Sequence, residues 1–165
     1  MTEPLKVVPH DKAVKTGVTD PSKVAESLAG SLADTYRLLF KTHAYHWNVE
    51  GPLFYSIHML TEEQYEDMFE AADEMAERMR ALGQLAPHTL AEMEKLSCIK
   101  DTAKLPDAAN MVEELAGDHQ AVAKRLHDVA EVAEDAKDIV TADLVTARAA
   151  FHEKAAWMLR ATVAQ

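Results

Sequence analysis

The sequence predicts an all-α protein: a bundle of four long helices with a long central crossover that carries a short helix. Three observations support this. Only five Gly and six Pro occur among 165 residues, which argues against turn-rich β architectures. Apolar residues repeat every three or four positions over four long stretches. The connections between these stretches are short, long and short, and the whole length suits one domain.

The first helix is expected to begin at Pro21, with Asp20 as its N-cap, and to end near Val49 before the Gly51-Pro52 turn. Its apolar stripe consists of Val24, Leu28, Leu32, Tyr36 and Leu39. Residues 1–19 show no sustained period and are expected to form a mobile tail. Residues 20–165 then make up the bundle.

The second helix follows the tight turn and should pack antiparallel against the first, as a hairpin closed by Gly83. Its stripe includes Met68, Met75 and Met79, which we expect to fill the core. Residues 84–106 are less regular, with a short helix expected over 89–96. Asp107 opens the third long helix, and the fourth begins near Asp138.

The composition narrows the functional classes. The formal net charge is −11, which disfavours a simple nucleic-acid binder and would either keep the protein soluble or attract cations. The single cysteine, Cys98, fits a reducing compartment. No stretch reads as a signal peptide or a membrane span, so we expect a cytoplasmic protein with no membrane partner.

Five residues in the first hairpin could bind a metal ion. His58 and Glu62 lie four apart on one helix, Asp73 and Glu77 repeat that spacing, and His46 precedes the turn at a similar height. Imidazole and carboxylate ligands suit iron, manganese or zinc. Charged residues four apart are also typical of a solvated acidic face, so the spacing alone leaves both interpretations open.

The spacing sets a constraint on any such site. Glu62 and Asp73 are eleven residues apart, roughly 16 Å along a helix. A bound metal needs its ligands within about 2 Å, so one chain cannot bring both pairs to one ion. If the pairs form one site, two chains must complete it across a two-fold axis.

Other histidines and aromatic residues are expected to have structural roles. His119 and His152 each stand alone on their helices. Trp47 and Trp157 are predicted to pack within the bundle, and His43 to cap a helix or to support a ligand rather than to bind metal.

Two motifs stand out in the first hairpin. Residues 46–54 read HWNVEGPLF and are followed by His58, twelve residues after His46. Residues 73–78 read DEMAER and are followed by Leu82 and Gly83. Together these motifs closely resemble the Dps family, the DNA-binding proteins from starved cells or miniferritins. Trp157 also sits where the family has a tryptophan on its fourth helix.

The resemblance implies a ferritin-like four-helix bundle, assembled as a hollow shell of twelve subunits. It implies a ferroxidase that oxidises ferrous iron, preferentially with hydrogen peroxide, and stores ferric mineral as a defence against oxidative stress. Iron is the metal, at a di-iron site on each two-fold interface; no haem and no other cofactor is expected. The catalytic residues and metal ligands carried over are His46, His58, Glu62, Asp73 and Glu77.

This sequence differs from the family at one ligand, because position 62 is often Asp in the family and is Glu here. Ordinary ferritins and bacterioferritins are disfavoured, since neither the second nor the fourth helix carries their Glu-x-x-His pair. Family members line their iron-entry pores with carboxylates. The candidates here are Asp118, Asp128, Glu131, Glu134 and Asp135, among which the sequence does not choose.

DNA compaction is the alternative function, because some family members bind DNA through a basic tail. Here Lys6, Lys12 and Lys15 are balanced by Glu3 and Asp11, so the tail is near neutral through residue 19. DNA binding is therefore disfavoured, although twelve tails on one particle would act together. The protein would be nucleoid-associated only if DNA is bound.

Overall fold

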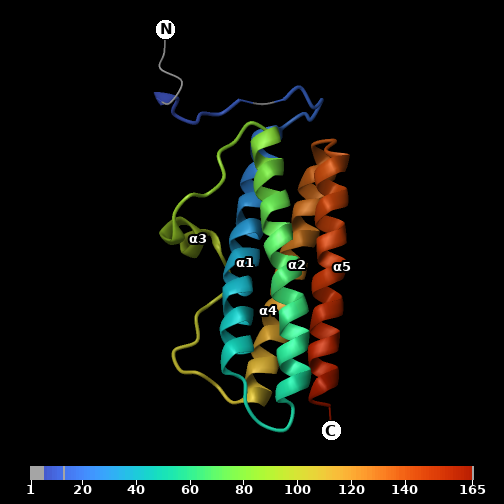
Figure 1. The fold of residues 1–165 in the computed structure, drawn as a ribbon. Coiled ribbons are helices and arrows are strands. Elements are labelled where there is room, and N and C mark those ends of the chain that lie inside the picture. The colour runs from blue at the N-terminus through green and yellow to red at the C-terminus, as the bar shows by residue number, and fades with distance from the viewer. Residues whose placement is uncertain (1–5, 13, 165) are drawn as a thin grey trace.

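Five helices make up the computed structural model, which describes residues 6–12 and 14–164 (Figure 1). They are α1 Pro21–Asn48, α2 Phe54–Ala81, α3 Leu90–Leu96, α4 Ala108–Asp135 and α5 Ile139–Thr162. No strand occurs among the described residues. The predicted all-α bundle with a short helix in its crossover is confirmed.

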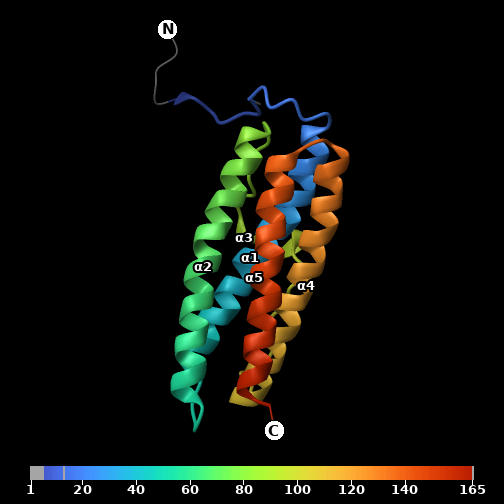
Figure 2. The same cartoon turned by 90° about the vertical axis from the view of Figure 1, so that its right-hand side faces the viewer.

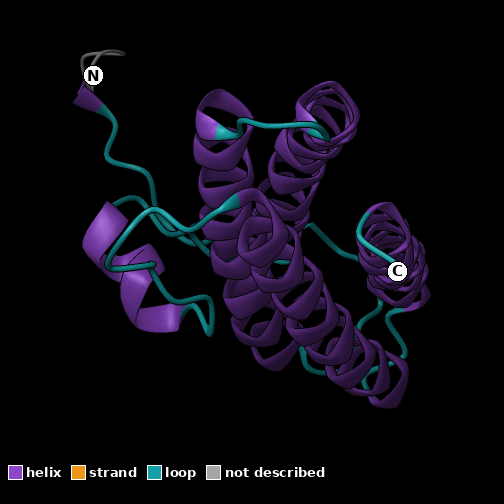
Figure 3. Ribbon diagram, turned by 90° about the horizontal axis from the view of Figure 1, so that it is seen from below, coloured by secondary structure: helices purple, strands orange, loops and turns teal. Residues whose placement is uncertain are grey.

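The four long helices form two antiparallel hairpins, α1 with α2 and α4 with α5, which lie side by side (Figures 1 and 2). The crossover runs the full length of the bundle and places α3 outside it, against α1 (Figure 3). Packing between α2 and α5 is sparse compared with packing inside each hairpin. No helix in the described part of the chain is long and apolar enough to cross a bilayer.

Side-chain caps begin the helices where the sequence predicts. Asp20 accepts a hydrogen bond from Lys23 N at 3.2 Å, and Asp107 accepts one from Asn110 N at 3.0 Å. Asp138 caps α5 through Thr141 N at 2.9 Å and also pairs with Arg78 of α2 at 2.6 Å. Burial by itself would raise the pKa of Asp138, but these hydrogen bonds outweigh it and hold the pKa below its ordinary value.

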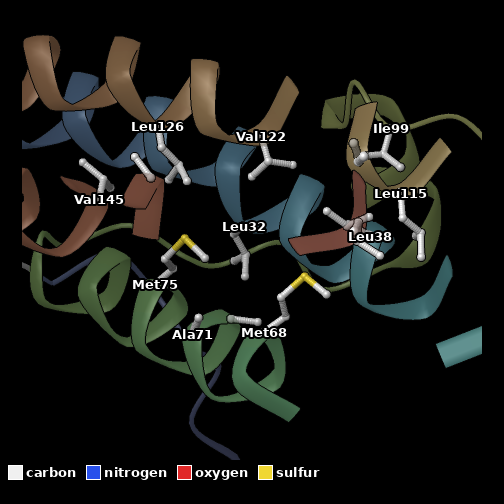
Figure 4. Close-up of a cluster of buried hydrophobic side chains, with 14 of the residues drawn as sticks. Leu32, Leu38, Met68, Ala71, Met75, Ile99, Leu115, Val122, Leu126 and Val145 are labelled. Atoms are coloured by element: carbon white, nitrogen blue, oxygen red, sulfur yellow. The ribbon is translucent and has the colours of Figure 1, made fainter. Parts of the chain in front are cut away.

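Aliphatic side chains and methionines from all four long helices fill the core (Figure 4). Met68, Met75 and Met79 are buried, as predicted. Two glycines with positive φ, Gly51 at 105° and Gly83 at 93°, turn the chain at the ends of the first hairpin.

Some of the predictions about aromatic packing are wrong. Trp47 and Trp157 are 59% and 67% exposed, so neither packs within the bundle, and Tyr36 is 40% exposed. The reason is helical geometry. Ala155, Ala156 and Leu159 turn toward the core and thereby direct Trp157 outward.

His119 and His152, for which structural roles are expected, meet in the core. Both are fully buried, and their Nδ1 atoms lie 2.8 Å apart across the α4–α5 interface. The two positions are 33 residues apart, so only the packing of α4 on α5 reveals that they meet.

The described part of the N-terminal tail lies across the end of the bundle where α1 begins (Figure 1). Val14 N donates to Ala81 O at 3.1 Å, and Thr19 N donates to Ala136 O at 3.0 Å. Positions 1–5 and 13 lie outside the described residues. The mobility of the tail stays a prediction.

Asp34 anchors the crossover to α1. Its side chain is fully buried and accepts hydrogen bonds from Ser97 Oγ at 2.8 Å and Cys98 N at 2.7 Å. Arg125 of α4 pairs with the same carboxylate at 3.1 Å. Its guanidinium lies over Gly30, where a Cβ would approach Arg125 Nη1 to 2.8 Å. One carboxylate therefore joins α1, α4 and the crossover.

We predict that Asp34→Ala lowers the free energy of unfolding by about 2–4 kcal/mol, because it leaves the Cys98 amide, the buried Ser97 hydroxyl and the Arg125 guanidinium without their acceptor. Guanidinium unfolding at fixed protein concentration measures this change. The control is Asp101→Ala, which removes the 83% exposed partner of Arg37 and should cost less than about 1 kcal/mol. Equal losses in the two variants would contradict the anchoring role.

Candidate metal centre

Two histidines from the first hairpin hold each other in place. His46 Nδ1 lies 2.9 Å from the backbone oxygen of His58, and His58 Nδ1 lies 2.9 Å from the backbone oxygen of His46. The rings stack with centroids 3.7 Å apart. The tight turn at Gly51 brings the end of α1 beside the start of α2 and so makes this reciprocal contact possible.

These contacts determine which ring nitrogen is available. A carbonyl oxygen only accepts hydrogen bonds, so the Nδ1 atom of each ring must carry the proton. In the neutral imidazoles, both Nε2 atoms then keep their lone pairs, which is the form that binds a metal ion. The hydroxyl of Thr61, fully buried, donates to His58 O at 3.0 Å and supports the same carbonyl.

The three carboxylates lie along α2, and the structure does not gather them. Glu62 is half-buried one turn after His58, whereas Asp73 and Glu77 are exposed further along the helix. Because α2 is continuous, Glu62 and Asp73 stand roughly 16 Å apart along its axis. Within residues 6–12 and 14–164, no three His, Cys, Asp or Glu side chains of the single chain converge on one ion position.

Aromatic rings pack around His46 on the α1 side. His43 stacks on Tyr65 with centroids 4.1 Å apart and also contacts Trp47 at 4.1 Å. Tyr65 meets the His46 ring edge-on at 5.2 Å. His43 caps no helix; it fills the space between two rings beside His46.

Burial and neighbouring charges shift two pKa values in this cluster. Desolvation, and then the nearby His46, lowers the pKa of His43. Desolvation, and then Glu62 and Glu66, raises the pKa of Tyr65, so its hydroxyl stays protonated near neutral pH. Tyr65 and Thr61 are not among the residues that the sequence predicts for this site. Their positions three residues after Glu62 and His58, on the same side of the helix, were the available signal.

The predicted pore residues differ in their surroundings. Asp118 is half-buried and pairs with Lys41 at 2.6 Å; burial is the main cause that raises its pKa. Asp128, Glu131, Glu134 and Asp135 are exposed on α4. Asp118 is thus engaged inside the subunit, and the other four remain candidates.

The fold and these motifs agree with comparisons to known proteins. The family model for the ferritin-like domain matches residues 25–165, which defines the chain as a ferritin-like helical protein. DNA protection during starvation protein 2 of Bacillus anthracis is 36% identical, with 87% of this chain and 98% of that protein covered.

Two solved structures agree as well. Dps from Staphylococcus aureus has a TM-score of 0.83 at 34% identity, covering 86% of this chain and 95% of that one. The Dps protein of Vibrio cholerae, described as a member of a broad superfamily of ferritin-like diiron-carboxylate proteins, has a TM-score of 0.84 at 28% identity, covering 93% and 98%. The chain belongs to the Dps family.

We predict that Tyr65→Ala weakens Zn²⁺ binding by about tenfold or more, because the ring that supports His46 is lost. Isothermal titration calorimetry on the assembled particle measures the affinity, with zinc as a redox-silent probe. Tyr65→Phe is the matched control: it keeps the ring contacts and should bind zinc as the unaltered protein does. Unchanged affinity in Tyr65→Ala would show that the ring does not position His46.

Proposed function

We propose that the protein is a ferroxidase and iron store that oxidises Fe(II) with hydrogen peroxide at sites shared between two subunits. The observation that carries this proposal is the reciprocal His46–His58 pair, which leaves two Nε2 lone pairs free, with Glu62 one helical turn after His58. A second pair of carboxylates, Asp73 and Glu77, lies too far along the same helix to reach it within one chain.

The donor set suits iron as the substrate. Two imidazoles and three carboxylates favour Fe(II) and stabilise Fe(III) through hard oxygen ligands. Two ferrous ions supply the two electrons that reduce one peroxide to two waters: 2 Fe²⁺ + H₂O₂ + 2 H⁺ gives 2 Fe³⁺ + 2 H₂O. Holding both ions in one site avoids the one-electron step that would release a hydroxyl radical. The longer side chain of Glu62 changes the reach of that ligand compared with the usual Asp.

The surface around the carboxylates supports a subunit interface there. Large apolar side chains are exposed on the hairpin of α1 and α2: Tyr36, Phe40, Tyr55, Met59 and Phe69. A groove of about 650 Å³ beside Asp73 is lined by Leu32, Ala76, Met93 and others. Exposed apolar patches of this kind typify interfaces. A two-fold axis near the middle of α2 would pair His46, His58 and Glu62 of one chain with Asp73 and Glu77 of another.

The proposal extends to the whole particle. Twelve subunits would enclose a cavity for ferric mineral, and the exposed acids on α4 would guide Fe(II) toward it. Iron is the only metal that the proposal requires, and haem has no role in it. Action in the cytoplasm agrees with the free Cys98, whose pKa is raised chiefly by burial and then by the charge of Asp34.

We predict that His46→Ala and Asp73→Ala each abolish fast iron oxidation by peroxide, because each removes a ligand. Both should leave the particle assembled, because Asp73 is exposed and His46, although buried, lies outside the apolar core cluster. Stopped-flow absorbance of Fe(III) formation, with one peroxide per two Fe(II), measures the rate. Glu74→Ala, which alters the exposed acid next to Asp73, is the control and should react at the normal rate. Normal oxidation in either ligand variant would overturn the assignment.

Mixed particles test whether the site is shared. Equal amounts of His46→Ala and Asp73→Ala chains are unfolded and reassembled together. Half of the random dimers then contain one chain of each variant, and one of the two sites in such a dimer keeps all its ligands. The mixture should therefore regain about a quarter of the normal number of sites. A site contained in one chain predicts no recovery. Separately reassembled variants serve as the inactive reference.

DNA binding is the second candidate function, since several relatives are named DNA protection during starvation proteins. The near-neutral tail and the net charge of −11 oppose it here. We predict no retardation of DNA in a gel shift at neutral pH and moderate salt, and retention only at acidic pH. Retardation at neutral pH that weakens as salt rises would favour the DNA function.

A further inference from the structure

A pair of histidines inside the bundle is unrelated to the metal centre. His119 on α4 and His152 on α5 are both fully buried. Their Nδ1 atoms lie 2.8 Å apart and their ring centroids 5.0 Å apart. The distance between centroids nearly equals the nitrogen separation plus two ring radii, its largest possible value, so the rings meet nearly end to end. Each Nε2 atom therefore lies on the side away from the other ring.

The contact requires exactly one proton between the rings. One Nδ1 donates and the other accepts, so a neutral pair is stable in this arrangement. In the part of the chain that the structure describes, neither Nε2 has a hydrogen-bond partner. The fully buried hydroxyl of Thr42 and the amide of Gln64, on α1 and α2, are likewise without partners.

The charged groups near the pair do not favour a further proton. Arg148, one turn before His152, is the charged side chain that acts on both rings, and it is positive. Asp67 of α2 is paired with Arg148 at 2.5 Å.

The carboxylates next to the two histidines in the sequence are engaged as well. Asp118 of α4 is paired with Lys41 of α1, and Glu153 of α5 is paired at the surface with His127 of α4. One further proton, taken up at the free Nε2 of the donating ring, would thus place an uncompensated charge in the core. A proton on each ring would also leave both Nδ1 atoms as donors and break the Nδ1–Nδ1 bond.

We propose that the His119–His152 pair is an acid-sensitive latch between α4 and α5, whose protonation separates these helices and loosens the particle. The latch uses no residue of the metal centre. It therefore acts whether or not the protein oxidises iron.

The direction of the pH effect follows from linkage. Burial, and then Arg148, lowers the pKa of His119 to about 3, and burial lowers that of His152 well below 6.5. In the unfolded chain both rings take up protons as pH falls through about 6.5. The stabilisation is therefore complete above that pH and is lost progressively as pH falls toward the folded values. Over this range, each histidine raises the unfolding constant about tenfold for every unit by which the pH falls.

The test uses the assembled, metal-free particle. Guanidinium unfolding and particle mass by light scattering are measured from pH 7.5 to 4.5 for the unaltered protein and for the double variant His119→Gln, His152→Gln. Glutamine keeps a polar contact and takes up no proton. As the pH falls, we expect the unaltered protein to lose stability more steeply than the variant. Its unfolding constant should rise by about ten- to a hundredfold more per pH unit than that of the variant. Equal pH slopes would overturn the proposal.

Two further measurements keep the test decisive. His127→Gln removes an exposed histidine of the same helix and should leave the steep slope intact. If the double variant does not fold, hydrogen–deuterium exchange at histidine Cε1, followed by mass spectrometry of the unaltered particle, reads each ring separately. We expect no titration of His119 or His152 between pH 7.5 and 5 while the particle is intact. Titration of either ring within that range, in the intact particle, would refute the latch.

Discussion

The hydrogen bonds between His46 and His58 depend on the close return of the chain at Gly51, and the candidate site depends on those bonds. Each ring is held by the other residue's backbone carbonyl, so the orientation of both imidazoles is set by the hairpin itself. The backbone carbonyls consequently select the tautomer of both rings and leave both Nε2 atoms as acceptors. The aromatic rings of Tyr65 and His43 then limit the movement of His46.

Buried polar groups connect the remaining elements. Asp34 joins α1 and α4 to the crossover, and Asp138 with Arg78 joins α2 to α5. These carboxylates are satisfied by several donors each, as burial of a charge requires. The His119–His152 pair is different, because its outer nitrogens have no partners among the described residues. The interior thus contains both fully satisfied ion pairs and one neutral pair that is sensitive to protons.

Much of the fold was predictable, because helix starts depend on local chemistry. Asp20, Thr89, Asp107 and Asp138 each cap a helix by accepting from a backbone amide three residues later. The tryptophans were not predictable in the same way. Apolar periodicity predicts which face of a helix is turned toward the core. How much of that face is buried depends on the neighbouring helices that cover it. Trp157 lies outside the part of α5 that they cover.

By itself, the sequence determined the helices, the hairpin and the spacing that separates Glu62 from Asp73, since all of these follow from local geometry along the chain. The tertiary structure alone decided which distant residues meet. The reciprocal bonds of His46 and His58, the support from Tyr65 and the contact between His119 and His152 all arise where two helices pack. Such contacts depend on the rotation and relative height of whole helices, which no local pattern encodes.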